Sequence, residues 1–244
     1  MSPELAMALA AGAVLLGSVV QGTVGFGMAL FSAPFVMLVD PSLMPGSLLT
    51  VAVLLTLAET VRERHHIDWR GLVWAITGRI PGNVMGAWLV AVVSGQALGV
   101  LVAVIVLTGV ALTARAVRIP IRPSTLVAAG TVSGISGTAT SIGGPPIALL
   151  YQHERGETVR GTLSAFFFAG AVISLVVLAI AGELSVRQLV AGALMAPMMA
   201  VGLSLAIPLR RRLKTERFRV AVLAVASASA VILLIRTLVG AITA

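Results

Sequence analysis

The feature that most constrains this chain is the scarcity of charge among apolar runs that follow one another along its whole length. Only 11% of the 244 residues are charged and 58% are hydrophobic, and the mean hydropathy is +1.06. Soluble domains carry about 25% charged residues, so this chain cannot cover a surface that faces water. The apolar runs do not alternate with polar residues, and helices satisfy the backbone in lipid without alternation. The sequence therefore predicts an all-α polytopic membrane protein.

Two of the apolar segments are broken near their middle. The first break, Gln21 to Gly27, contains three glycines and separates two arms at 5–20 and 28–39. Arms of this size are about 18–24 Å long, against a hydrocarbon core of about 30 Å. The second break, at 137–146, lies within the segment 124–152. Broken segments at corresponding positions in two halves are typical of the binding sites of secondary transporters.

Six further segments have the length and composition of spans, at 47–60, 71–93, 96–114, 161–181, 188–209 and 220–239. The second of these is expected to be interrupted at 79–83, around Pro81. An offset of 116 places Gly25-Phe26-Gly27 on Ser141-Ile142-Gly143 and Pro81 on Pro197. We therefore predict two repeats, 1–118 and 119–244, within one integral membrane domain.

The loop charges favour one of two topologies. If both broken segments cross fully, there are eight helices (4+4) and the basic loops divide almost evenly between the two sides. If both are re-entrant hairpins, each repeat keeps three full helices and the repeats are inverted. The loops 62–70, 115–122, 155–160 and 210–219, with fourteen Lys and Arg residues, then share one side. The positive-inside rule favours this arrangement and makes that side cytoplasmic, with both termini outside.

The net charge of +8 does not indicate a nucleic-acid partner, because the basic residues lie in short clusters between apolar runs. The expected partners are the lipid bilayer and a small anion, and a homodimer is left open. Cysteine is absent, the three histidines fall in loops, and no cofactor or metal is predicted.

The second arm of each hairpin begins at its break, so its N-terminus points into the protein. A helix N-terminus carries free N–H groups and a partial positive charge, which attract anions. The alternative is that the glycines only allow close helix packing and that the hydroxyls bond to their own backbone. The candidate anion-binding residues at the two breaks are Gln21, Thr23, Gly25, Phe26, Gly27, Thr138, Thr140, Ser141, Gly143 and Gly144.

Two further candidates lie next to Pro81. Arg79 suits a sulfonate or carboxylate through its planar fork of donors, and Asn83 is on the same kink. The alternative for Arg79 is that it snorkels to the basic interface, about 12 Å away along its helix. Glu59 ends a span near Arg62, which predicts a surface ion pair. Since none of the nine acids lies clearly within a span, we expect export or facilitated flow without a coupling ion. Export of an anion from a cell that is negative inside is favoured by about 2.3 kcal/mol of free energy per charge per 100 mV of membrane potential.

These residues resemble the sulfite exporter TauE/SafE family, also called the 4-toluene sulfonate uptake permeases, which shows a glycine-rich signature once in each half. The second copy here consists of Gly130, Gly134, Gly137 and Ser141-Ile142-Gly143-Gly144-Pro145-Pro146. The first copy consists of Ser18, Gln21-Gly22, Gly25-Phe26-Gly27-Met28 and Pro34. The resemblance implies a bacterial inner-membrane permease for small anions such as sulfite, organosulfonates or related carboxylates. Ser18 and Met28 replace glycines of the signature, so the pocket is expected to differ there.

Two other classes of function remain as alternatives. An intramembrane enzyme would need a nucleophile–base pair or a metal cluster within the spans, and Ser136 and Ser141 have no His, Lys or Asp at that depth. We therefore do not expect an enzyme. The other alternative is a membrane subunit that transports nothing itself.

Overall fold

The computed structural model describes residues 2–114, 119–212 and 215–243, and within these ranges it contains helices and no strands. The prediction of an all-helical chain is confirmed. The α-helices are α1 (Pro3–Val24), α2 (Met28–Val39), α3 (Gly46–Glu63), α4 (Trp69–Val92), α5 (Gly95–Ala114), α6 (Pro123–Thr140), α7 (Gly144–Tyr151), α8 (Gly156–Ile180), α9 (Val186–Arg212) and α10 (Thr215–Thr243). Two short 3-10 helices, η1 (Pro41–Leu43) and η2 (Arg64–His66), lie before and after α3.

Both breaks are shorter than the sequence suggested. Helix α1 continues through Gln21 and Gly22 and ends at Val24, so only residues 25–27 separate it from α2. Helix α6 likewise continues to Thr140, and α7 begins at Gly144. The expectation that the first arm is too short to cross a membrane is wrong, because an isolated Gly22 weakens a helix without ending it. The second arms are short, with 12 residues in α2 and 8 in α7.

The predicted interruption at 79–83 is also wrong. Helix α4 runs without a break from Trp69 to Val92 with Pro81 inside it, and α9 contains both Pro197 and Pro208. Proline is tolerated inside membrane helices because neighbouring helices and side chains satisfy the backbone groups that it frees. Arg79 and Asn83 therefore lie one turn apart on a continuous helix rather than in a loop.

Helix α2 folds back along α1. The Ser32 hydroxyl in α2 donates to the carbonyl oxygen of Ala13, 2.8 Å away, and a side chain at Gly17 would lie 2.7 Å from the Met28 carbonyl oxygen. Residues that follow the break thus contact residues progressively earlier in α1. The two helices form an antiparallel hairpin whose turn is the first break.

Glycines allow the closest helix pair, α4 and α6, to approach backbone to backbone. A Cβ atom at Gly78 or Gly82 would overlap a carbonyl group of α6, and one at Gly130 would overlap the Ala75 carbonyl of α4. The Thr131 hydroxyl uses this proximity to donate to the Gly78 carbonyl oxygen, 3.1 Å away. Small residues at such contacts are typical of membrane helices, whose association depends on close packing. Elsewhere α1 packs against α9, α3 against α8, and α5 against α10.

Four helices within the described residues are long and apolar enough to cross a membrane: Glu4–Val24, Gly95–Leu112, Gly156–Ile180 and Val186–Leu209. Shorter apolar helices occur at Met28–Val39 and Leu223–Val239. Many large apolar side chains on the outside of the bundle are exposed, including Trp88, Ile180 and Leu194. These features show a multi-pass membrane protein.

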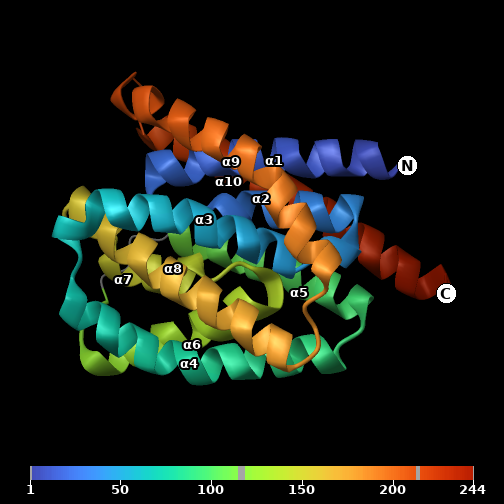
Figure 1. Cartoon of the computed structure of the whole chain (residues 1–244), viewed down its shortest axis with the longest axis horizontal. Helices are drawn as coiled ribbons and strands as arrows, with labels where there is room; N and C mark the ends of the chain where they lie inside the picture. The colour runs from blue at the N-terminus through green and yellow to red at the C-terminus, as the bar shows by residue number, and fades with distance from the viewer. Residues whose placement is uncertain (1, 115–118, 213–214, 244) are drawn as a thin grey trace.

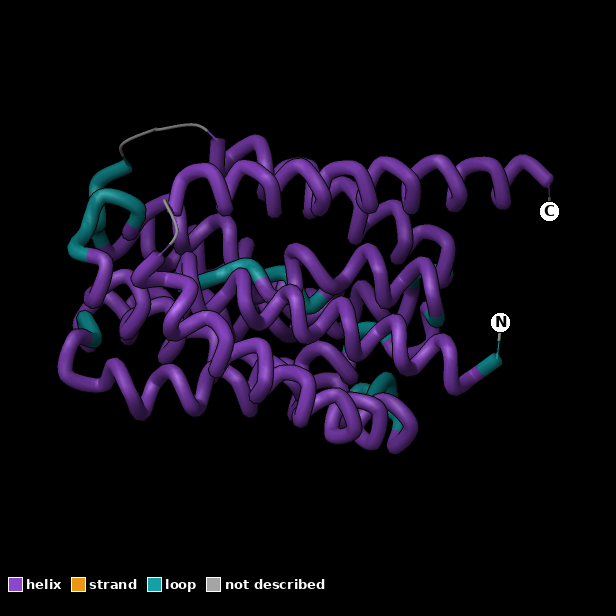
Figure 2. Tube along the Cα trace, turned by 90° about the horizontal axis from the view of Figure 1, so that it is seen from above, coloured by secondary structure: helices purple, strands orange, loops and turns teal. Residues whose placement is uncertain are grey.

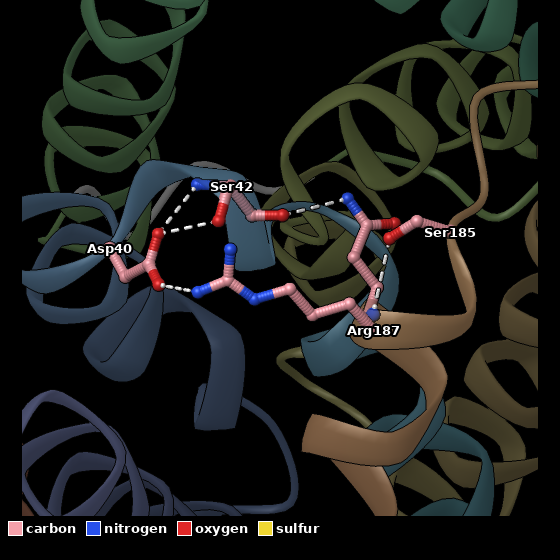
Figure 3. A network of polar contacts seen from close by, with 5 residues as sticks. Asp40, Ser42, Ser185 and Arg187 are labelled. Atoms are coloured by element: carbon pink, nitrogen blue, oxygen red, sulfur yellow. Dashed lines mark hydrogen bonds and ion pairs between the residues drawn. The ribbon is translucent and has the colours of Figure 1, made fainter. Parts of the chain in front are cut away.

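The start of α1 and the end of α10 lie at the same end of the long axis (Figures 1 and 2), and the connection from α3 to α4 lies at the opposite end (Figure 1). At the end near the termini, the turn between α2 and α3 is tied to the start of α9 (Figure 3). The Arg187 guanidinium is 2.7 Å from the Asp40 carboxylate, which also accepts from Ser42, and Gln188 donates to the carbonyl oxygens of Ser42 and Met44. At the opposite end, Glu63 is 3.2 Å from Arg160 of α8.

Candidate functional site

The two breaks begin alike, with a left-handed residue directly after the first helix, but they differ at the residue before the second helix, which has φ 117° at Gly27 and φ −102° at Gly143. At the first, Gly25 follows α1 with φ 96° and Gly27 precedes α2 with φ 117°. At the second, Ser141 follows α6 with φ 64°, although it is not glycine, and Gly143 precedes α7. The αL region is strained for most L-residues, and a Ser141 hydroxyl bond to the Pro45 carbonyl oxygen, 2.9 Å away, helps to hold it there.

A cavity of about 50 Å³ lies between the two breaks. This volume exceeds what one water molecule needs, about 10–15 Å³ on the same measure. Helices α3, α4 and α8 complete its wall. The lining residues are Gln21, Phe26, Gly27, Met28, Ala29, Leu30, Leu49, Ala52, Thr56, Arg79, Gly137, Ser141, Ile142, Gly143, Gly144, Pro145, Phe167 and Ala171. The structure thus brings both breaks together around one internal space.

Arg79 is the only charged residue among the described residues that line this cavity. Its side chain is only 3% exposed, so the alternative that it snorkels to the interface is wrong. The guanidinium lies 4.3 Å from the centre of the Phe166 ring, a cation–π contact. Within the described part of the chain, its Nε and Nη1 atoms have no hydrogen-bond partner. A buried, unpaired cation costs several kcal/mol, and an anion in the cavity would supply the missing partner.

Three glycines make room for this guanidinium. A Cβ atom at Gly137 or Gly143 would lie 3.1–3.2 Å from Arg79 Nη2, and one at Gly170 of α8 would overlap the guanidinium itself. Arg79 comes from α4 and the glycines come from α6, the second break and α8. Its position therefore depends on the packing of three separate segments.

Most of the predicted hydroxyl donors are already engaged. Thr23 donates to backbone carbonyl groups of its own helix, and so does Thr140. Thr138 shares a 2.9 Å hydrogen bond with Ser174 of α8. For Thr23 and Thr140 the geometry matches the alternative that these hydroxyls satisfy their own backbone. Of the predicted residues at the breaks, those that do not line the cavity are Thr23, Gly25, Thr138 and Thr140.

The two inward helix N-termini offer fewer donors than the sequence suggested. Pro145 and Pro146 occupy the first turn of α7 and have no N–H group. In α2, the Met28 amide already donates to the Gln21 side-chain oxygen, 3.3 Å away. The positive end of each helix still faces the cavity, but Arg79 supplies the strongest donors there.

Asn83 lies one turn beyond Arg79 and is fully buried, yet it does not line the cavity. Its amide nitrogen donates to the Gly170 carbonyl oxygen, 3.1 Å away, and its side-chain oxygen has no partner among the described residues. Asn83 therefore links α4 to α8 directly behind the site of Arg79. Its role in binding remains a prediction.

The expectation that Glu59 forms a surface ion pair with Arg62 is wrong. Its carboxylate instead accepts hydrogen bonds from Gln21 of α1, at 3.0 Å, and Ser164 of α8, at 3.2 Å. Glu59 lies one turn before the end of α3 and faces the bundle, because α1 and α8 both pack beside it. Transport without a coupling ion was expected because no acid lies clearly within a span. Glu59 faces neighbouring helices of the bundle, so the distribution of acids no longer supports that expectation.

Several residues at or near the site were not among the predicted ones. Phe167 lines the cavity, whereas Phe166 and Gly170 contact Arg79. All three belong to one apolar run, and no local pattern distinguishes them from residues of that run that face elsewhere. Ser164 was missed for the same reason. The sequence did point to Glu59 as a candidate, because it is an acid near the end of an apolar helix. An acid at such a position can face either neighbouring helices or water.

An apolar helical bundle that holds a buried cation in an internal cavity between two helix breaks is the architecture of an integral membrane protein with a polar ligand site. Comparison with protein families identifies which family of membrane proteins this is. The family model "Sulfite exporter TauE/SafE" matches residues 9–233. The chain belongs to this family of membrane transporters. Neither the comparison with curated proteins nor that with solved structures gives a match.

Proposed function

We propose that this protein is a permease for small anions, namely sulfite, organosulfonates or related small carboxylates, and that the anion binds in the cavity between the two breaks. The observation that carries this proposal is Arg79, whose buried guanidinium lines that cavity with two nitrogen atoms unpaired among the described residues. Guanidinium groups bind carboxylates and other oxyanions through parallel N–H donors.

The remaining walls of the cavity suit a small anion with an apolar part. Phe26, Phe167, Leu30 and Ile142 contribute apolar surface, and Gln21 contributes a polar side chain. A sulfonate or carboxylate head would lie against Arg79 and its short carbon chain against the aromatic rings. Gly143 and Gly144 leave the backbone accessible to the head group.

We further propose that the chain consists of two inverted repeats, 1–118 and 119–244, each with a re-entrant hairpin and three crossing helices. Helix α2 is about 18 Å long and α7 about 12 Å, and neither length crosses a core of about 30 Å. The contacts of α1 with α9 and of α6 with α4 correspond to each other under the offset of 116, and so do those of α2 with α10 and α7 with α5. The matching contacts support the repeat, and the short second arms together with the antiparallel packing of α2 on α1 support hairpins over eight full crossings.

In this arrangement the basic loops face the cytoplasm of a bacterial cell and both termini lie outside the inner membrane. The hairpin turns meet inside the bundle, where irregular backbone is tolerated because it lines a cavity. Rocking of one repeat against the other would open the cavity to each side in turn. Net flow follows the gradients that act on the anion.

The test is uptake into proteoliposomes of sulfite, sulfoacetate, acetate and chloride, with the wild type and Arg79→Gln. A charge-assisted hydrogen bond contributes about 1.5–3 kcal/mol, so the apparent affinity for the transported anion should fall roughly 10- to 150-fold. The thermal stability should not fall, because the variant removes an unpaired buried charge.

Arg187→Gln is the matched control, since Arg187 is 63% exposed and does not line the cavity. It should retain wild-type affinity. Failure of all four anions to move, or unchanged affinity in a folded Arg79→Gln protein, would refute the proposal. A subunit that transports nothing would give the first result.

A further inference from the structure

A second, smaller cavity of about 20 Å³ lies beside the first, and Glu59 lines it. The Glu59 carboxylate accepts from the Gln21 amide nitrogen at 3.0 Å and from the Ser164 hydroxyl at 3.2 Å. Gln21 also lines the first cavity. One glutamine side chain therefore connects the acid in the second cavity to the proposed anion site.

The orientation of Gln21 depends on the ionisation of Glu59. A carboxylate only accepts hydrogen bonds, so it must face the NH₂ group of Gln21. The Gln21 oxygen then faces the other way, where it accepts the N–H of Met28, 3.3 Å away. Met28 is the first residue of α2 and lines the anion cavity. While Glu59 is ionised, the Gln21 oxygen therefore accepts the hydrogen bond of the Met28 N–H, which an anion in the first cavity could otherwise accept.

Protonation of Glu59 reverses the orientation that its hydrogen bonds require of Gln21. A protonated Glu59 can donate through its O–H group, so the Gln21 oxygen can turn toward it and accept. The NH₂ group of Gln21 then faces Met28, whose N–H loses its acceptor. Two donors now face the first cavity without a partner, and the oxygens of a bound anion can accept from both. Loss of the negative charge on Glu59 also removes a repulsion of the anion.

Among the described residues, three other charged groups line the second cavity with Glu59: Arg62 and Glu63 from α3 and Arg160 from α8. Arg160 is 3.2 Å from Glu63, which orients it toward that neighbouring acid. Helix α1 contributes the uncharged Gly22, and the lining residues from the described side chains of α9 are Leu203 and Ile207. The bonds to the Glu59 carboxylate therefore come from uncharged side chains.

We propose that Glu59 is a proton-binding site of the transport cycle, and that its protonation turns Gln21 so that a proton and an anion bind and cross the membrane together. This inference rests on the proposed function of the first cavity. Ionisable groups within membrane bundles serve in proton relays. Linkage is reciprocal, so a proton that tightens anion binding is itself held more tightly when the anion is bound. A proton that accompanies a monovalent anion cancels its charge, and voltage then no longer drives the flow.

The experiment uses proteoliposomes that contain a pH-sensitive dye, with the voltage held at zero by valinomycin and equal potassium on both sides. The probe is methanesulfonate, which stays ionised near neutral pH and so does not cross lipid as a neutral acid. An inward methanesulfonate gradient should acidify vesicles that contain wild-type protein, by about one proton per anion. Over the range where Glu59 titrates, the apparent anion affinity should rise by up to about tenfold per unit fall in pH, the limit for one linked proton.

Glu59→Gln is neutral and keeps a donor at this position, as a protonated acid does. It should bind methanesulfonate with an affinity independent of pH and should move it without protons. Glu63→Gln, which removes an acid one turn away, should still acidify the vesicles. Even if Glu59→Gln does not fold, the wild-type measurement still tests whether a proton accompanies the anion, and its absence overturns the inference.

Wild-type anion flux without proton entry would overturn this inference and leave the anion permease standing. Proton entry that persists in a folded Glu59→Gln protein would overturn it as well. Absence of flux for methanesulfonate and for the four anions named above would overturn both proposals.

Discussion

Substitution of Gly170 by alanine would displace the Arg79 guanidinium without changing any charge. The added Cβ atom would overlap Arg79 Nε and Cζ. Because non-bonded heavy atoms are stable at about 3.5–4 Å, the guanidinium would have to move by roughly 1–2 Å. It is the flexible end of a long side chain, so it can move at little cost to the fold. We therefore expect Gly170→Ala to fold normally and to lose the anion site.

The magnitude follows from the hydrogen bonds that the displaced guanidinium could no longer make. Loss of one charge-assisted bond costs about 1.5–3 kcal/mol, which corresponds to a roughly 10- to 150-fold weaker apparent affinity. The concentration dependence of sulfite or methanesulfonate uptake into proteoliposomes measures this change. A thermal unfolding scan in detergent measures whether the fold survives, and its midpoint should change by only a few degrees.

Gly12→Ala is the matched control, because a Cβ atom at Gly12 in α1 would meet no atom of another helix within 4 Å among the described residues. Its affinity and stability should equal or exceed those of the wild type, since alanine favours a helix over glycine. If Gly170→Ala folds and still transports with wild-type affinity, the anion does not depend on the position of Arg79. The proposed site would then be wrong, whatever the effect of Arg79→Gln.

Two further predictions concern the bundle. Gly78→Ala should lower the free energy of unfolding by about 1–3 kcal/mol, as overpacking does, because its Cβ would overlap the Val127 carbonyl of α6. A thermal unfolding midpoint equal to that of Gly12→Ala would contradict the close α4–α6 contact. The chain has no cysteine, so single substitutions Arg62→Cys, Arg155→Cys, Gly95→Cys and Glu183→Cys can report topology through an impermeant thiol reagent. The hairpin arrangement predicts that positions 62 and 155 react from one side and 95 and 183 from the other, whereas labelling of 62 and 155 from opposite sides would favour eight crossing helices.

Local sequence was enough to locate both breaks to within a few residues. Gly25 and Gly27 adopt positive φ, a backbone freedom of glycine that does not depend on distant partners. The boundaries were less accurate, because α1 passes through Gly22 and α4 passes through Pro81, where neighbouring helices compensate for an unfavourable local preference. The ionisable residues were the least predictable. The sequence placed Glu59 at the end of a helix and Arg79 at an interruption that the structure does not contain, and it did not show whether either side chain faces lipid, water or another helix.

The sequence by itself determined that this chain is a helical membrane protein with two glycine-rich breaks 116 residues apart. Those properties follow from composition and local backbone preference, which act over a few residues. Only the tertiary structure decided that Arg79 faces the cavity between the breaks and that Glu59 reaches Gln21. Each depends on which side of a helix is turned inward, and packing sets that rotation. The guanidinium lies where it does because Gly137, Gly143 and Gly170, from three other segments, leave that space open.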